Sequence, residues 1–278
     1  MKDVNIKVQQ ARGRGVMVSR IVEVNNAALH CQIEGPSDAP VVVFSNSLGT
    51  DFRIWDAVVA DLAQDYRVLR YDKRGHGLSD DPEDGWSMGE LVGDLAALMD
   101  HFGVSGATVV GLSVGGLIAQ GLAAERPDLV RVMVLADTAA RIGNDDMWNE
   151  RIAKVQAEGL GPMADGILER WFAPEFHNHS DFPMWRNMLV RTTAQGYARV
   201  CAAIRDTDLL ESTARLSLPV LAVVGDKDGS TPPDMVRETA ELVSGSSFQI
   251  IRGAGHLPCV EKPEVFTSLL RDFLKAHS

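Results

Sequence analysis

The chain has 278 residues, which is enough for one large domain with a substantial buried core. Its formal net charge is −11, and this acidic balance argues against nucleic acid as a partner, because a polyanion would be repelled. Its basic residues form no cluster that would bind a membrane surface, and no apolar run approaches the length of a membrane span. An anionic small-molecule substrate would therefore need a local cationic patch.

Short apolar runs alternate with helical patterns along the chain, after an N-terminal extension (residues 1–19) that lacks the apolar core of a signal peptide. Asn25-Asn26 separates the first two runs and suits a tight β-hairpin. The later runs are rich in Val, Ile and Leu, which is typical of parallel strands that helices cover on both faces. Eight strands are predicted, over residues 20–25, 27–35, 40–47, 66–72, 107–113, 130–137, 218–225 and 247–253.

The predicted helices lie near residues 52–64, 87–102, 114–126, 232–243 and 261–276. The alternation is interrupted over residues 139–210, where several helical patterns follow the sixth strand with no strand between them. We predict that this insertion is a helical lid over the carboxyl ends of the strands, where open α/β sheets bind ligands. The flanking segments, 20–138 and 211–278, then form the core with its mostly parallel sheet.

Three of the five tryptophans fall within the predicted lid. We consider Trp148 and Trp171 candidates for contact with a substrate, because ligand pockets are mostly lined by apolar and aromatic side chains. The alternative for each is that it packs only within the small core of the lid.

The stretch Gly111-Leu112-Ser113-Val114-Gly115 fits the pattern G-x-S-x-G between a predicted strand and a predicted helix. On such a sharp turn the serine takes an unfavourable backbone conformation, so its neighbours must lack bulky side chains. The turn lifts the hydroxyl above the sheet and next to a helix N-terminus, whose free N–H groups stabilise negative charge. We expect Ser113 to be a nucleophile; the alternative is a plain strand-to-helix connection that contains a serine.

A serine hydroxyl needs a base, and the base needs an acid that orients it. His256 follows the last predicted strand and is the candidate base, and Asp228 follows the strand before it and is the candidate acid. Both lie at carboxyl ends of strands, as Ser113 does, so we expect the three loops to meet at one edge of the sheet. Asp226 in the same loop and Asp137 at the end of the sixth strand are the alternative acids.

The oxyanion of an acyl-transfer intermediate needs two hydrogen-bond donors. The candidates are the backbone N–H of Val114, directly after the nucleophile, and that of Ser47, at the end of the third predicted strand. A second histidine, His76, lies in a Gly-rich loop, where a hydrogen bond to the backbone explains it better than a role as base.

The three cysteines, Cys31, Cys201 and Cys259, are widely spaced, and no pair has the spacing of metal ligands. Reduced, buried thiols are the simplest explanation, so we expect a cytoplasmic protein. Cys259 follows His256 by three residues, but we assign it no catalytic role.

Over residues 20–276 the chain resembles enzymes of the α/β-hydrolase fold, in its three loops and in the segments YDKRGHGLSD and GAGHLPCVEKPEVF. It differs from most of that superfamily at Ser45-Asn46, where His-Gly is usual. A narrower resemblance, to the 3-oxoadipate enol-lactonases, rests on the segments FSNSLGTDFRIWD, GLSVGGLIAQ, YARVCAAIRDTDLLE and GDKDGSTPP. The resemblance implies an eight-stranded, mostly parallel sheet flanked by helices, with the lid after the sixth strand.

The resemblance also implies an activity: hydrolysis of 3-oxoadipate enol-lactone to 3-oxoadipate, in the β-ketoadipate route of aromatic breakdown, by a site without metal or cofactor. Ser113, Asp228 and His256 would form the triad, and Ser47 and Val114 would donate to the oxyanion. An acyl-enzyme on the serine and a direct attack by water held by the same groups are both compatible with these residues.

The implied substrate carries a carboxylate, which the net charge of the protein repels. We expect a lid arginine to bind it, and Arg191 and Arg205 are the candidates because they lie near the matching lid segment. The alternative is that each pairs with lid carboxylates such as Asp206 and Asp208.

Other functions fit the same motifs. A general carboxylesterase or a carbon–carbon bond hydrolase of this fold would share the triad and differ in the contents of the lid. A ligand-binding sensor would keep the fold without turnover, although no residue of the predicted triad is missing.

Overall fold

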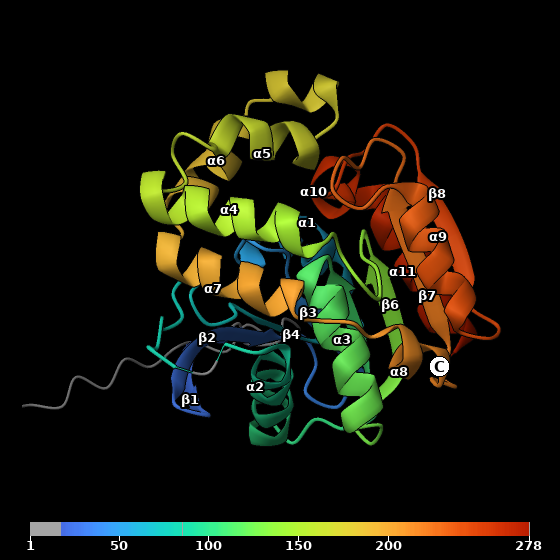
Figure 1. The fold of residues 1–278 in the computed structure, drawn as a ribbon. Coiled ribbons are helices and arrows are strands. Elements are labelled where there is room, and N and C mark those ends of the chain that lie inside the picture. The colour runs from blue at the N-terminus through green and yellow to red at the C-terminus, as the bar shows by residue number, and fades with distance from the viewer. Residues whose placement is uncertain (1–17, 85, 278) are drawn as a thin grey trace, which may run out of the picture.

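The computed structural model describes residues 18–84 and 86–277, which form an eight-stranded sheet between two layers of helices (Figure 1). The spatial order of the strands is β1-β2-β4-β3-β5-β6-β7-β8. β2 runs antiparallel to both of its neighbours, and the strands from β4 to β8 in this order are parallel. The strands are β1 (Val18–Val24), β2 (Ala27–Glu34), β3 (Val41–Ser45), β4 (Arg67–Tyr71), β5 (Ala107–Leu112), β6 (Val130–Ala136), β7 (Val220–Gly225) and β8 (Ser247–Ile251).

The eight strands lie within a few residues of their predicted ranges, so the mostly parallel sheet is confirmed. Asn25 and Asn26 connect β1 to β2 with φ values of 46° and 63°, and a two-residue hairpin with the right-handed twist requires positive φ at both positions. The predicted extension over residues 1–19 lies outside the described residues except for its last two, which begin β1.

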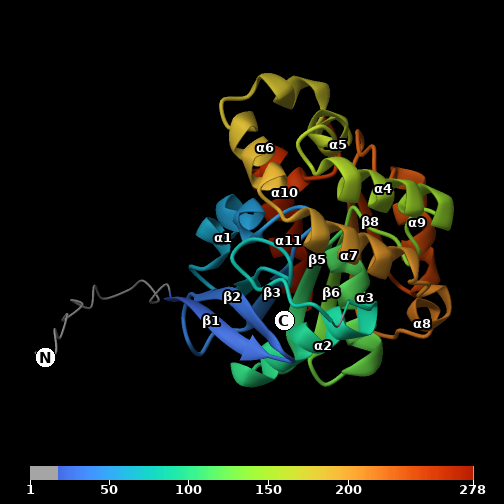
Figure 2. The ribbon, with the colours of Figure 1, turned by 60° about the vertical axis from the view of Figure 1, so that its left-hand side comes forward.

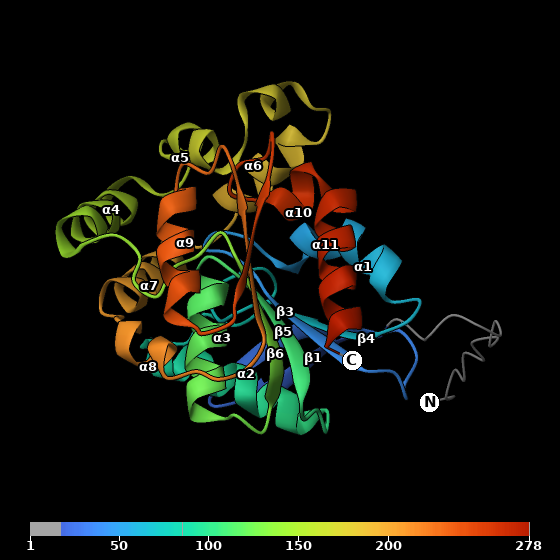
Figure 3. The ribbon, with the colours of Figure 1, turned by 90° about the vertical axis from the view of Figure 1, so that its right-hand side faces the viewer.

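The central strands are buried on both faces, which explains their continuous apolar sequences. Every residue of β5 and of β7 is buried. Helices α1 and α11 pack against each other on one face of the sheet, and α2, α3, α8 and α9 cover the other face (Figure 3). These helices are α1 (Asp56–Leu62), α2 (Met88–His101), α3 (Val114–Glu125), α8 (Leu210–Ala214), α9 (Pro233–Leu242) and α11 (Pro263–Ala276).

The chain between β6 and β7 contains no strand, and four of its helices lie above the carboxyl edge of the sheet (Figures 1 and 2). We call them the lid helices: α4 (Asp145–Glu158), α5 (Ala164–Trp171), α6 (Phe182–Val190) and α7 (Ala194–Arg205). The next helix, α8, packs against α3 and α9 of the core, so the layer above the sheet ends with α7.

No helix within the described residues has both the length and the apolar character needed to cross a membrane. The three cysteines are buried and form no disulfide with one another.

Candidate active site

Ser113 lies on the sharp turn between β5 and α3, with φ 57° and ψ −119°. A positive φ is uncommon for a residue with a side chain, and it persists only where the surroundings fix it. Here the N–H of Ser113 donates to the carbonyl of Ala136 at 3.0 Å, and its own carbonyl accepts from Thr138 Oγ1 at 2.6 Å. Hydrogen bonds from the end of β6 thus hold the strained turn in place.

The glycines around this serine are required by close approach of the backbone. A Cβ at Gly111 would lie 2.2 Å from the carbonyl oxygen of Gly115, and a Cβ at Gly115 would lie 2.1 Å from that of Ser45. No side chain fits at such distances, so the G-x-S-x-G pattern follows from the geometry of the turn.

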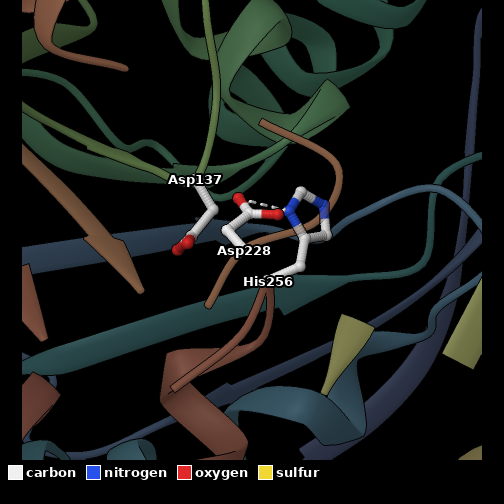
Figure 4. Close-up of side chains that lie close together, drawn as sticks. All are labelled: Asp137, Asp228 and His256. Atoms are coloured by element: carbon white, nitrogen blue, oxygen red, sulfur yellow. Dashed lines mark hydrogen bonds and ion pairs between the residues drawn. The ribbon is translucent and has the colours of Figure 1, made fainter. Parts of the chain in front are cut away.

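His256 and Asp228 lie in the loops after β8 and β7, and both are buried. The two side chains are joined by a hydrogen bond of 2.9 Å between His256 Nδ1 and Asp228 Oδ2 (Figure 4). The backbone N–H of His256 donates to the carbonyl of Trp171 at 2.8 Å, so the loop is also fixed from the lid side. The structure therefore pairs the predicted base with the first of the predicted acids.

The second ring nitrogen of the histidine is directed to the loop after β3. His256 Nε2 lies 3.4 Å from Ser47 Oγ, and within the described residues no hydrogen bond joins it to Ser113 Oγ. Hydrogen bonds between a base and its nucleophile are often long or misaligned without substrate. The hydrogen bond between Ser113 and His256 therefore has to form before proton transfer.

Asp228 accepts four hydrogen bonds, two on each oxygen. Its Oδ1 accepts from the N–H groups of Ser230 and Thr231 at 2.7 and 3.1 Å, and its Oδ2 accepts from Thr231 Oγ1 at 2.7 Å as well as from His256. Four donors leave the carboxylate little freedom to rotate. A carboxylate fixed in this way can hold the histidine ring in one orientation, as the acid of a triad does.

Asp137, the alternative acid at the end of β6, lies beside Asp228 (Figure 4). Its Oδ1 accepts from the N–H of Gly225 at 2.9 Å, and its buried Oδ2 has no donor within the described residues. Burial, and after it the charge of Asp228, raises the pKa of Asp137 well above its usual range. It makes no hydrogen bond to His256 in the described chain, which favours Asp228 as the orienting acid.

One oxygen from each of Asp137 and Asp228 and one nitrogen from His256 lie within 4.8 Å of one another, the arrangement of a possible metal site. The oxygens of Asp228 already accept four hydrogen bonds, so a cation would have to displace donors that are already bound. This set of groups fits a proton relay better than a metal centre.

The register of the sheet brings the two candidate oxyanion donors together. Ser45 on β3 pairs with Gly111 on β5, so Ser47 and Ser113 each follow their strand pair by two residues. The N–H of Ser47 and that of Val114, the first residue of α3, have no acceptor within the described residues. Two unpaired N–H groups beside a serine hydroxyl are what a developing oxyanion requires.

A buried lysine supports the Ser47 loop. Lys73 Nζ donates to the carbonyl of Ser47 at 2.7 Å, and Thr50 Oγ1 donates to the same oxygen at 2.9 Å. Burial lowers the pKa of Lys73 to about 7. The sequence analysis did not identify this residue, because nothing in its local pattern shows that the Asp-Lys-Arg run enters the core.

The other predicted loop residues have structural partners. His76 Nε2 accepts from the N–H of Gly49 at 2.9 Å, and its Nδ1 donates to the carbonyl of Arg74 at 3.2 Å. Burial lowers the pKa of His76 well below its usual value, so the ring is neutral. Asp226 Oδ1 accepts from the N–H of Gly253 at 2.7 Å and joins the β7 and β8 loops rather than binding the histidine.

A family model described as the alpha/beta hydrolase fold matches residues 40–263 of this chain. The chain is an α/β hydrolase.

This hydrolase is 36% identical over 250 residues to 3-oxoadipate enol-lactonase 1 of Acinetobacter baylyi, and the alignment covers 89% of this chain and 93% of the relative. It is 34% identical over 252 residues to 3-oxoadipate enol-lactonase 2 of the same organism, with 90% and 94% covered. Its fold is similar to the crystal structure of the enol-lactonase from Burkholderia xenovorans LB400, with a TM-score of 0.89, 37% identity, and 92% and 99% of the two chains covered.

The lid of the hydrolase places the two candidate tryptophans differently. The ring of Trp171 packs against the loop of Ser47. A Cβ placed on Gly49 in that loop would lie 3.4 Å from Trp171 Cη2, which is an ordinary van der Waals contact. Trp148 is buried, and its Nε1 donates to the carbonyl of Ile142 at 2.7 Å within the lid segment. Trp171 is therefore the tryptophan that contacts the site.

The two candidate arginines lie away from the triad residues. Arg205 binds Asp206 through two hydrogen bonds of 2.7 and 2.9 Å and Asn149 through another of 2.7 Å, which is the pairing that the sequence left as the alternative. Arg191 is exposed and lines a cavity of about 680 Å³ between α6 and the loops after β3 and β4. Neither Ser113 nor His256 lines that cavity.

Two other lid arginines were missed by the sequence analysis. Arg151 on α4 and Arg170 at the end of α5 are half-buried and have no ion pair with any carboxylate in the described residues. The signal that could have identified them is their position next to the candidate tryptophans: Arg151 follows Trp148 by three residues on a helix, and Arg170 precedes Trp171.

Proposed function

We propose that this α/β hydrolase hydrolyses 3-oxoadipate enol-lactone to 3-oxoadipate with Ser113 as nucleophile, His256 as base and Asp228 as orienting acid. The observation that carries the proposal is the buried His256–Asp228 pair at the same sheet edge as the strained turn of Ser113. The choice of substrate is supported by enol-lactonase relatives that align over about 90% of the chain.

In the proposed first step, Ser113 Oγ attacks the lactone carbonyl while His256 Nε2 takes the hydroxyl proton. Asp228 stabilises the imidazolium through Nδ1, and the N–H groups of Ser47 and Val114 donate to the oxyanion. The bond between the carbonyl carbon and the ring oxygen then breaks. The ring opens as an enolate, which takes the proton held by His256 and becomes the ketone, so that the imidazole is neutral again.

In the second step, His256 takes a proton from water, and the resulting hydroxide attacks the acyl group on Ser113. The ester bond breaks, the serine recovers its proton, and the product leaves as 3-oxoadipate, so that one water is consumed per lactone. A water held by the same groups could attack the lactone directly, and trapping of an acyl-enzyme distinguishes the two routes. We place this reaction in the aromatic breakdown of the cytoplasm.

The test is to mix the purified protein with freshly generated enol-lactone and follow the loss of its ultraviolet absorbance. Ser113→Ala should lower kcat by about 10⁴- to 10⁶-fold, because a triad without its nucleophile keeps only the oxyanion donors and binding. Ser105→Ala, in an exposed loop, is the matched control and should be as active as the wild type. Full activity of Ser113→Ala would refute the proposed mechanism.

The same purified protein, tested with other substrates and with a serine-directed label, distinguishes two kinds of alternative function. Rapid hydrolysis of p-nitrophenyl acetate or of a vinylogous diketo acid, without turnover of the lactone, would indicate a carboxylesterase or a carbon–carbon hydrolase. A chain that turns over none of them and is not labelled at Ser113 by a serine-directed phosphonate would be a ligand-binding sensor.

A further inference from the structure

The cavity between lid helix α6 and the loops after β3 and β4 lies outside the candidate active site. Its volume of about 680 Å³ is in the range of small-molecule sites. Neither Ser113 nor His256 lines it, so a molecule bound there would not contact the nucleophile or the base. The cavity therefore has no role in the proposed reaction and needs an explanation of its own.

One face of α6 and its C-terminal residue form the lid side of this cavity. The side chains that line it here are Met184, Asn187, Met188 and Arg191. They share one side of the helix because residues three and four apart lie above one another. The guanidinium of Arg191 and the amide of Asn187 make no hydrogen bond or ion pair within the described residues. The face thus combines two flexible apolar side chains with two polar groups that are free to bind a ligand.

The core side of the cavity is largely apolar and aromatic. The rings of Phe52 and His30 stack there with their centroids 4.8 Å apart. Leu78, on the loop after β4, is 73% exposed, and Met184 on the α6 side is 43% exposed. Exposed apolar side chains are ordinary when they are scattered, but two on opposite walls of one cavity form a patch that a ligand would cover.

The two carboxylates of the cavity already have donors. Asp72 accepts a hydrogen bond of 2.8 Å from the N–H of Phe52 and forms another of 2.8 Å with His30 Nδ1. Both oxygens of Asp51 accept from Arg53 Nε, at 2.9 and 3.1 Å. Two aspartates and two arginines line the cavity, so it lacks the acidic excess of the whole chain, whose net charge is −11. The binding capacity left over is that of the donors on α6, which suits an anionic acceptor.

A ligand in this cavity would bridge the lid and the core, because α6 packs on the loop after β3. The N–H of Asp51 donates to Met188 Sδ at 3.4 Å, and a Cβ placed on Gly49 would lie 2.8 Å from Leu189 Cδ1. Gly49 follows Ser47, the candidate oxyanion donor, by two residues. A molecule held between α6 and this loop would therefore restrict the segment next to the oxyanion donor.

We propose that this cavity is a second ligand site, which binds a small carboxylic acid with a flat apolar body. Arg191 and Asn187 donate to the carboxylate, and a planar guanidinium suits this task because it donates two parallel hydrogen bonds. The body of the ligand lies against Phe52, Leu78 and the two methionines of α6, whose unbranched side chains adapt to its shape. The bound acid is not hydrolysed, so the site stands independently of the proposed function.

The experiment compares two probes that share a ring and differ in charge: 2-naphthoate and the neutral 2-naphthalenemethanol. Isothermal titration calorimetry of the full chain should show one naphthoate per chain, with a Kd roughly 10- to 100-fold lower than that of the alcohol, the effect of one charged hydrogen bond. The naphthoate Kd should stay within about twofold after treatment with a serine-directed phosphonate, because the cavity does not include Ser113.

Arg191→Met should raise the naphthoate Kd by roughly 10- to 100-fold and leave the Kd of the alcohol unchanged. Leu78→Ser should raise both by about 3- to 10-fold, because it removes apolar contact from the ring. Arg205→Met, whose guanidinium is bound to Asp206 in the wild type, is the matched control and should change neither. In all three variants kcat and KM for p-nitrophenyl acetate should equal those of the wild type.

Hydrogen–deuterium exchange locates the ligand without any variant. Naphthoate should slow exchange over residues 182–192, 49–53 and 76–79 and leave the turn over residues 111–116 unchanged. Protection confined to the turn of Ser113 and the loop of His256 would overturn the inference, as would an unchanged naphthoate Kd in Arg191→Met. A rise in KM for the enol-lactone in Arg191→Met, without weaker naphthoate binding, would assign this arginine to the catalytic site instead. A protein that binds naphthoate as described but does not open the lactone would refute the proposed substrate and retain the second site.

Discussion

At the carboxyl edge of the sheet, the carboxylate of Asp228 and the loop residues near it have hydrogen-bond partners, whereas two half-buried arginines of the lid helices form no ion pair within the described residues. Asp228 accepts four hydrogen bonds, and His76 and Asp226 bind backbone groups of neighbouring loops. In the lid, Arg151 and Arg170 form no ion pair with an acid in the described part of the chain. The edge thus fixes its triad groups by hydrogen bonds, and the lid leaves two guanidinium groups without a carboxylate.

This difference assigns distinct roles to the two regions. The hydrogen bonds at the edge hold Asp228 and His256 in one geometry, which lowers the reorganisation needed in the transition state. Half-buried guanidinium groups without a carboxylate cost stability, because burial removes part of their hydration. Substitutions at the edge should therefore change kcat, and substitutions in the lid should change KM for anionic substrates.

The largest expected effect separates the two buried acids of the edge. Asp228→Asn should lower kcat by about 10³- to 10⁴-fold, because the amide no longer holds the tautomer of His256 that accepts a proton. Asp137→Asn should stay within about tenfold of the wild type, since Asp137 makes no hydrogen bond to the histidine within the described residues and burial already disfavours its charged form by raising its pKa. Steady-state kinetics on p-nitrophenyl acetate measure both, and the reverse order of effects would make Asp137 the orienting acid.

A smaller effect is expected where the edge supports the oxyanion loop. Lys73→Met removes the donor to the Ser47 carbonyl but fills the same buried volume. We expect kcat to fall roughly tenfold with little change in KM, as for a loss of transition-state stabilisation alone. Lys275→Met, on the last helix, serves as the control. A rise in KM at constant kcat would place Lys73 in substrate binding instead.

The lid should respond in the opposite way. Tyr197→Phe keeps the ring that packs on Gly49 and removes only the hydroxyl near the two arginines. We expect KM for the p-nitrophenyl hemiester of succinic acid, which carries a free carboxylate, to rise about 3- to 10-fold, the effect of one neutral hydrogen bond, with kcat unchanged. Equal changes for the hemiester and the neutral acetate would show that the hydroxyl does not contact the carboxylate.

The smallest effect concerns the residue that joins the two regions. Glu261, at the end of α10 (Pro258–Glu261), accepts from the N–H of Gly255 at 2.6 Å in the histidine loop and from that of Ala173 at 2.9 Å in the lid segment. Burial raises its pKa from 4.5 to about 7. The folded state therefore binds this proton more tightly than the unfolded state does.

The stabilisation from that proton is complete below pH 4.5 and is lost as the pH rises through about 7. Glu261→Gln should remove this dependence, so the difference between wild-type and variant unfolding free energies should change with pH by at most about 1.4 kcal/mol per unit. Urea unfolding at several pH values between 5 and 8 measures it, with the exposed Glu264→Gln as control. If the unfolding free energies of wild type and Glu261→Gln changed with pH in parallel, the proton on Glu261 would not be the cause of the dependence.

The strands could be predicted because their residues repeat a local pattern. Continuous apolar runs mark buried parallel strands, and Asn25-Asn26 marks the hairpin through the positive φ that asparagine tolerates. The loops of Ser113, Asp228 and His256 could be placed at one edge because each directly follows a strand. The pairing of His256 with Asp228 rather than with Asp137 could not be read from spacing, since both aspartates end strands beside it.

The roles expected of the lid arginines Arg191 and Arg205 stay predictions, and local sequence could not decide them for a related reason. Arg191 and Arg205 were chosen by nearness in sequence to a matching segment, but helices α4, α5 and α7 meet through contacts between distant residues. Which guanidinium finds an aspartate, as Arg205 does, depends on the side chains of neighbouring helices. No local pattern contains that information.

The sequence by itself determined the order of strands and helices, the glycines around Ser113 and the set of polar residues at the strand ends, because these depend on backbone geometry within a few residues. Only the tertiary structure decided which of those polar groups are joined, which carboxyl has a raised pKa and which arginines of the described residues lack an acid. The reason is that hydrogen bonds, burial and charge act through space, between segments that the chain separates by many tens of residues.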